Sequence, residues 1–287
     1  MESRARTLWQ RTEPLHAVIY FDEECRGIGR SVGLKGFWMG YFATRTAPMG
    51  PVRPETATSV LAVFAPGMVA RALPASWKIV EPGALVDLRA RLAARALRGL
   101  VPGVDALAGQ LAPYLMAMVE AASDLARPLF AANRPLCDRA DPVERLWQLT
   151  TALREFRGDA HAAALADHGL DAPEALVLAA ATGRVPREGI QLDRGWSDPE
   201  WADAEERLRS RGLIDAHSAV TARGRAERDL VEDTTDRLAG RLLGPLAEST
   251  ADALLAALEA PARRVADALL PFPNPIGLPA SDQAASG

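Results

Sequence analysis

The sequence has few cysteines and no long uninterrupted apolar run. Two cysteines, Cys25 and Cys137, are too few for a disulfide framework, and neither lies in a CxxC or Cys/His cluster with metal-ligand spacing. No stretch reaches the roughly 18 uncharged apolar residues of a membrane span, and the N-terminus lacks the apolar segment of a signal peptide. These absences predict a cytoplasmic protein with reduced thiols and no membrane partner.

Positive charge is also scarce. The chain of 287 residues carries 33 Lys and Arg against 37 Asp and Glu, for a formal charge of -4. This balance argues against a general nucleic-acid binder, because phosphate backbones attract basic surfaces. With 48% hydrophobic residues the chain is long enough to bury one large core or two smaller ones.

Apolar residues recur at helical spacing from end to end, and few segments favour strands. The spacing predicts a mostly α protein, with helices at about 13–32, 36–47, 84–100, 104–126 and 247–270. The polar, proline-containing run Arg134–Pro142 is the best candidate for a linker. The final segment, 271–287, has no periodic pattern and is predicted to be a disordered tail.

The two halves of the chain resemble each other. Residues 31–35 match 167–171, so that Gly169 lies 136 residues after Gly33. An apolar helix, a Pro or Gly turn and an aromatic opening to another helix follow each match. The pattern predicts two winged-helix-like repeats, residues 1–133 and 143–270, which form a pseudo-dimer with short β-hairpin wings, connecting helices and a cleft between the repeats.

Residues 196–225 have the order of a recognition helix, a wing and a closing helix, and they resemble MarR-type transcription regulators. A DNA-binding recognition helix needs Lys and Arg to contact phosphates. The segment Asp198–Arg209 instead holds five acids and two arginines. The resemblance implies a DNA-binding regulator as the alternative function, whereas the charge opposes it and favours no nucleic-acid partner.

Longer motifs resemble the SalK-like family of actinobacterial helix-turn-helix-like proteins. They are the segments 16–21, 36–52, 155–161 and 195–197, and the likeness extends over most of residues 10–270. The resemblance implies the fold and a setting near natural-product pathways, and it implies no catalytic role. Members of the family often have His where this chain has Ala179.

The sequence has only four histidines, and two of them are candidates for a site between the halves. His16 lies on the first helix, and His161 follows shortly after Arg157 in the second half. We predict a polar, aromatic-lined cleft that binds a small organic molecule of anionic or polyketide-like character. The proton-transfer residues predicted for it are His161, Asp159 and His16, and the ligand-binding residues are Arg45, Tyr20, Trp38, Tyr41 and Arg157. Asp159 is expected to orient the His161 imidazole, and Arg45 to attract the anion.

Each of these residues also has a structural interpretation. Arg157 and Asp159 cap or bridge helices in that reading, His16 is a hydrogen-bonded core residue, and the aromatic helix is buried on all sides. The absence of HExxH, CxxC and phosphate-loop motifs predicts no metal and no cofactor, although haem ligation through His16 or His161 stays open. The sequence thus predicts a small-molecule-binding protein or an enzyme of proton-transfer or cyclisation chemistry.

Overall fold

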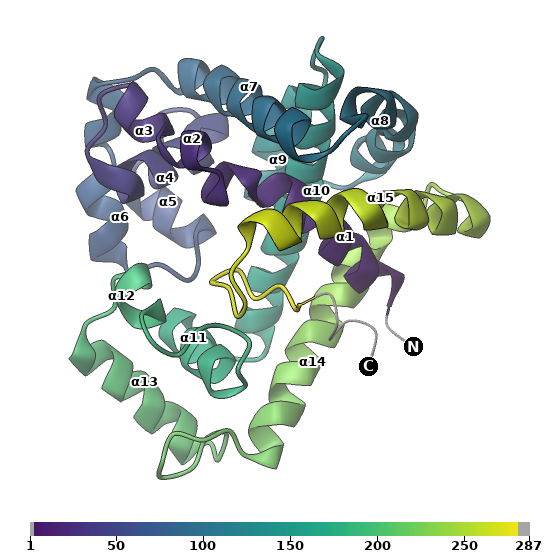
Figure 1. The fold of residues 1–287 in the computed structure, drawn as a ribbon. Helices are drawn as coiled ribbons and strands as arrows, with labels where there is room; N and C mark the ends of the chain where they lie inside the picture. Colours follow the sequence, from purple (N-terminus) through teal and green to yellow (C-terminus); the bar gives the residue numbers. More distant parts are fainter. Residues whose placement is uncertain (1–2, 281–287) are drawn as a thin grey trace.

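The computed structural model describes residues 3–280 and confirms the mostly helical prediction (Figure 1). The α-helices are α1 (Arg4–Phe21), α2 (Glu23–Arg26), α3 (Ile28–Ser31), α4 (Gly36–Thr46), α5 (Pro54–Val60), α6 (Pro66–Ala72), α7 (Pro82–Leu100), α8 (Val104–Ala121), α9 (Pro128–Asn133), α10 (Pro142–Asp167), α11 (Ala172–Ala181), α12 (Ile190–Arg194), α13 (Asp198–Ser210), α14 (Ala222–Ala239) and α15 (Glu248–Leu269). Short 3-10 turns lie at Ala47–Met49, Ala75–Lys78, Arg134–Leu136 and Gly240–Leu243. None of the helices between residues 3 and 280 is both long and apolar enough to cross a membrane.

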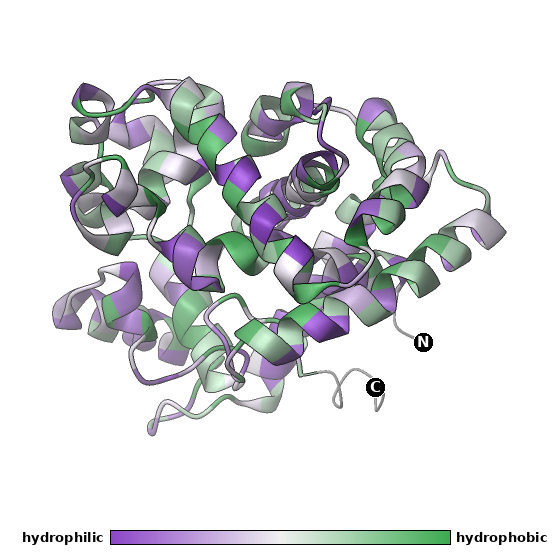
Figure 2. Ribbon diagram, turned by 45° about the horizontal axis from the view of Figure 1, so that its top comes forward, coloured by the Kyte–Doolittle hydropathy of each residue, from purple (hydrophilic) through white to green (hydrophobic). Residues whose placement is uncertain are grey.

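Helix α10 lies at the centre of the molecule (Figure 1). Asp141 begins it by accepting hydrogen bonds from the backbone N–H groups of Val143 and Glu144, and Pro142 occupies the first position, where no N–H is needed. The helix contacts α1, α7, α8, α9 and α14. Hydrophilic and hydrophobic residues alternate along the helices (Figure 2), and the buried apolar ones form a main core drawn from both halves of the chain.

Two helix ends, at Gly33 and at Gly169, have the same turn geometry. Gly33 and Gly169 both adopt left-handed backbone angles, with φ of 86° and 61°. The N–H of Leu34 donates to the Gly29 carbonyl at 2.8 Å, and that of Leu170 donates to the Leu165 carbonyl at 2.9 Å. Both are the six-to-one hydrogen bond that closes a helix end, and α4 and α11 begin two residues later.

The packing of the helices is reciprocal. Helices α1 and α10 contact each other, and α7 and α14 each contact both of them. Helix α8 of the first half packs on α10 of the second, and α15 of the second half packs on α1 of the first. These contacts join helices from the two halves into one core.

The predicted β-hairpin wings are wrong. Residues 3–280 contain no strand, and only Ile214 and Val220 form an isolated antiparallel bridge. Asp215 folds the intervening residues into a tight loop by accepting from the N–H groups of His217 and Ala219. Thr221 then begins α14 directly by accepting from the Gly224 N–H, which leaves no length for a second strand.

The first helix also differs from its prediction at 13–32. It begins earlier, at Arg4, and ends at Phe21, because Asp22 leaves the helical region and instead caps α2 through a hydrogen bond from the Cys25 N–H. Gly29 of α3 then lies directly against Gly40 of α4, where a Cβ atom on Gly29 would come within 2.6 Å of the Gly40 Cα. This close crossing fixes the position of α4.

The tail does not have the disorder that we predicted for residues 271–280, and 281–287 lie outside the described residues. The segment after α15 turns back toward α11 and α12 (Figure 1). Asn274 is fully buried; its side chain donates to the Leu278 carbonyl at 2.8 Å and accepts from the Leu278 N–H at 3.0 Å. Arg194 of α12 donates to the Pro275 carbonyl at 2.7 Å. Residues 273–278, here called the strap, are therefore held by defined hydrogen bonds that periodicity cannot reveal.

Candidate anion-binding pocket

A cavity of about 230 Å³ lies between α1, α4, α10, α11, α14 and the strap. Its wall combines guanidinium groups with apolar and aromatic side chains, as in many ligand pockets. The cationic lining residues are Arg45, Arg154, Arg157, Arg184, Arg194 and Arg228; the acidic ones are Glu13 and Glu232; and the apolar or aromatic ones include Trp9, Tyr41, Phe64, Leu165, Leu176, Ala179, Val185 and Ile276.

At one end of the pocket the charges are balanced. Arg45 and Arg154 contact Glu155 at 3.3 and 2.8 Å, and Arg154 also contacts Glu13 at 3.5 Å. Burial alone would raise the pKa of Glu155, but Arg154 and Arg45 lower it to about 2. Two guanidinium groups thus meet two carboxyl groups here. The partner of Arg45 is Glu155, and its charge is satisfied within the protein.

At the other end the charges do not balance. Glu232 is contacted by Arg228 at 2.5 Å, Arg157 at 3.0 Å, Arg184 at 3.5 Å and Arg6 at 3.6 Å. The second carboxylate of this group is Asp236, which lies 2.8 Å from Arg6 and 3.1 Å from Arg157. Burial alone would raise the pKa of Glu232, but the arginines hold it well below its usual range. Four guanidinium groups therefore face two carboxylates, which leaves a partly buried positive excess. We call these six residues the Glu232 cluster.

Two lining arginines have unused donor atoms. The Nη1 of Arg228 and the Nε of Arg194 are buried and lack a hydrogen-bond partner among residues 3–280. Arg194 lies over the Phe64 ring, 4.8 Å from its centroid, and it forms no ion pair within the described part of the chain. Buried guanidinium donors without partners are costly, and the side chains of both arginines line the pocket.

His161 sits beside the Glu232 cluster. Its Nδ1 is 3.0 Å from the Thr235 hydroxyl, which itself donates to the Val231 carbonyl at 2.7 Å. Burial lowers the pKa of His161 to about 4, and Arg228, Arg157 and Arg184 add to this against the opposing charge of Glu232. The imidazole is consequently neutral at physiological pH.

The structure brings four of the predicted site residues together. Tyr41, Arg45, Arg157 and His161 all line the pocket, and the Arg45 guanidinium donates to the Tyr41 hydroxyl at 3.0 Å. Ala179, where the SalK-like family often has His, lines it as well. The predicted meeting of α4 and α10 at one cavity is thus present.

His16, Tyr20 and Trp38 lie outside this pocket. His16 is buried, with Nδ1 2.9 Å from the Thr151 hydroxyl and Nε2 3.1 Å from the Tyr20 hydroxyl. Burial lowers the pKa of His16 well below its usual range and raises that of Tyr20. Both ring nitrogens of His16 are therefore engaged in hydrogen bonds within the protein. Trp38 packs against Phe42 and Phe64 behind the pocket wall.

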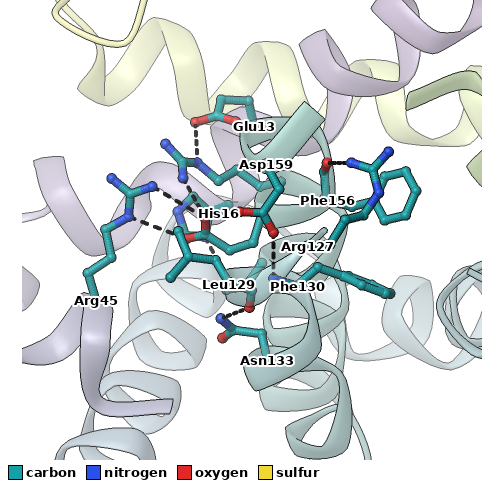
Figure 3. A network of polar contacts seen from close by, with 12 residues as sticks. Glu13, His16, Arg45, Arg127, Leu129, Phe130, Asn133, Phe156 and Asp159 are labelled. Carbon is teal, nitrogen blue, oxygen red and sulfur yellow. Dashed lines mark hydrogen bonds and ion pairs between the residues drawn. The ribbon is translucent and has the colours of Figure 1, made fainter. Parts of the chain in front are cut away.

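The predicted pairing of Asp159 with His161 is wrong. The Asp159 carboxylate accepts the N–H of Phe130 at 3.0 Å and so stabilises the start of α9, as Figure 3 shows. Its pKa is raised to about 6, chiefly by burial. Because α10 continues through Gly158, positions 159 and 161 point in different directions, as residues two apart on a helix do.

Several pocket residues were not predicted from the sequence: Arg154, Arg184, Arg194, Arg228 and Glu232. Two of the helices carry a usable signal. On α10, Arg154, Arg157, His161 and Leu165 recur at spacings of three or four and form one face; on α14, Arg228 and Glu232 do the same. Charged residues on a face that also holds apolar residues indicate a buried polar surface. Within residues 3–280, no group of three His, Cys, Asp or Glu side chains is arranged to hold a metal ion.

Residues 5–271 match a helix-turn-helix family. The chain belongs to this family. A comparison with curated proteins and one with solved structures each gave no match. The match covers both halves and α15, so the six arginines that line the pocket lie inside the matched region, whereas the strap residues 275–277 lie just beyond it.

Proposed function

We propose that this helix-turn-helix family member binds a small organic anion in the pocket beside the Glu232 cluster. The observation that carries the proposal is the excess of guanidinium groups over carboxylates at that end. A partly buried cluster with surplus positive charge gains free energy from a bound anion, because the guanidinium groups have already lost part of their hydration. Arg45 contributes less to anion binding than the sequence indicated, since Glu155 neutralises its charge.

The size of the cavity limits the ligand. An apolar protein cavity of about 150 Å³ holds benzene. A cavity of about 230 Å³ is roughly half as large again, which suits one or two fused rings bearing an acidic group. The apolar surface of Phe64, Leu176 and Val185 is available to such rings, and the arginines to the acid. Such a ligand is compatible with the predicted small organic molecule of anionic or polyketide-like character.

The resemblance to the SalK-like family extends the proposal to natural-product metabolism, where such anions occur. Proton-transfer or cyclisation chemistry on the bound anion is the enzymatic form of the same proposal, and the position of the His161 imidazole in the pocket wall supports it. The reciprocal helix packing supports a duplicated unit with the pocket between its halves. The buried free thiols of Cys25 and Cys137 fit the predicted cytoplasmic setting.

A MarR-like DNA-binding regulator is the second candidate, and family membership favours it. The surface of α13 opposes it, because its arginines already have partners. Arg207 contacts Asp171 at 2.6 Å, and Arg209 contacts Glu206 at 2.5 Å. Arg211 donates to the carbonyls of Gly169 and His168. Few cations remain on this face to neutralise phosphates.

Matched pairs of acids and neutral amides test the proposal: benzoate with benzamide, and 2-naphthoate with 2-naphthamide. We expect both acids to raise the melting temperature more than their amides at equal concentration, because only the acids pair with the arginines. Equal shifts for acid and amide would contradict the proposal. A footprint on duplex DNA at nanomolar protein, combined with equal shifts, would favour the regulator.

A further inference from the structure

We infer that His161 recognises a hydroxyl group on the bound anion, with its Nε2 accepting the hydroxyl hydrogen. The ligand class is thereby narrowed from an aromatic acid to a hydroxylated aromatic acid. This inference rests on the proposed function, because it concerns the same pocket.

Thr235 fixes which imidazole nitrogen carries the hydrogen. The Val231 carbonyl can only accept, so the Thr235 hydroxyl donates its hydrogen there, at 2.7 Å. The remaining lone pairs of Thr235 Oγ1 must then accept from His161, which requires the hydrogen on Nδ1. The other nitrogen, Nε2, is left with a lone pair and acts as an acceptor.

No partner for that lone pair is found among residues 3–280, although the imidazole lines the pocket. The surrounding charged groups are Arg157, Arg184, Arg228 and Glu232. The arginines donate hydrogen bonds and suit an acid group, whereas neutral Nε2 can only accept. A ligand that satisfies both kinds of group carries an anion for the arginines and a donor for His161. Among uncharged donors, a hydroxyl on the ring meets this need with the least added volume.

A second histidine in this chain also bonds a threonine through Nδ1, and its Nε2 already accepts a hydrogen bond from a hydroxyl group. His16 has its Nδ1 2.9 Å from the Thr151 hydroxyl, which is 2.9 Å from the Trp147 carbonyl, so its hydrogen is also on Nδ1. Its Nε2 accepts from the phenolic hydroxyl of Tyr20 at 3.1 Å. His16 thus accepts a hydrogen bond from the phenol group of Tyr20. The Nε2 of His161 is the same kind of acceptor, and the His161 imidazole lines the pocket.

The experiment compares 2-naphthoate with its hydroxylated isomers, including 6-hydroxy-2-naphthoate, by isothermal titration calorimetry. We expect at least one isomer to bind about fivefold more tightly than 2-naphthoate, which corresponds to about 1 kcal/mol. His161→Phe should remove this preference while 2-naphthoate still binds better than 2-naphthamide. Thr235→Val should weaken the preference, and the matched variant Thr151→Val, which alters the His16 pair, should leave it unchanged.

In the titrations, the inference is overturned if no isomer binds more tightly than 2-naphthoate, or if the preference survives in His161→Phe. Loss of the acid preference over the amide is a separate result, and it overturns the proposed function together with this inference. A readout without ligand is the ¹⁵N NMR spectrum of the imidazole. The Nδ1–H tautomer of His161 is expected, and the Nε2–H tautomer would also overturn the inference.

Discussion

Replacement of Asp159 by Asn tests whether this residue is structural or supports chemistry. Burial raises the pKa of Asp159 from its ordinary 3.8 to about 6. A difference of about two pKa units corresponds to a cost of about 3 kcal/mol for carrying the ionised group in the folded state, as an upper limit. The cost is absent below pH 3.8, and it grows as the pH rises toward 6 and reaches its full size above 6. An Asn at this position keeps a carbonyl that accepts from the Phe130 N–H and carries no charge.

We therefore expect Asp159→Asn to be more stable than the wild type at pH 8, by up to about 3 kcal/mol, with the difference shrinking as the pH falls from 6 to 3.8. Urea unfolding at pH 8, 6 and 4 measures this. Asp159→Ala is the control, because it leaves the buried Phe130 N–H unpaired and should be less stable than the Asn variant by about 1–3 kcal/mol. A destabilised Asn variant at pH 8, or a difference that does not change with pH, would refute the reasoning. An altered ligand affinity of the Asp159→Asn variant would indicate that Asp159 has a role in the pocket after all.

The remaining predictions concern the pocket and the strap. The pKa of His161 in the folded protein is about 4, below its ordinary value of 6.5. The stability of the wild type should therefore fall relative to that of His161→Phe as the pH drops from 6.5 to 4, as measured by urea unfolding of both proteins. Two stability curves that run parallel over this pH range would contradict the prediction. Glu232→Gln removes the carboxylate that four arginines share. It should cost about 3 kcal/mol of stability and should tighten the binding of 2-naphthoate. Weaker binding of 2-naphthoate by a folded variant would argue against anion attraction at the Glu232 cluster. Arg194→Ala should speed amide hydrogen exchange in residues 273–278, because it removes the hydrogen bond to the Pro275 carbonyl. The exposed control variant Arg187→Ala should leave this exchange unchanged. Equal exchange rates in both variants would show that the strap is held by other contacts.

The sequence predicted the helical class well, because helical periodicity depends on local apolar spacing that the core then buries. It also matched the segments around Gly33 and Gly169, and both glycines adopt left-handed backbone angles that end a helix. The wings were mispredicted because Asp215 and Thr221 use their side chains to bond nearby backbone groups, which shortens the loop to a single bridge.

The candidate site was predicted only in part. Arg45 and His161 do reach one pocket, as expected from two apolar helices that each carry a cation or an imidazole. The predicted pairing of Asp159 with His161 fails because both lie on the continuous helix α10, where residues two apart point in different directions. Arg228 and Glu232 lie in a charge-rich stretch of α14 that has the composition of a solvent-exposed face. Only the packing of α14 on α10 shows that this face is buried.

The central claim is that the positive excess of the Glu232 cluster binds an organic anion. The most direct measurement is calorimetric titration of 2-naphthoate and 2-naphthamide into the wild type, Arg228→Gln and the exposed control Arg187→Gln. Arg228 is the informative position, since it lines the pocket and its Nη1 has no hydrogen-bond partner among residues 3–280. The account predicts that the acid binds at least about tenfold more tightly than the amide in the wild type and in the control, a difference of about 1.4 kcal/mol, and that Arg228→Gln largely abolishes this preference. Equal affinities for acid and amide in the wild type, or an unchanged preference in Arg228→Gln, would contradict it.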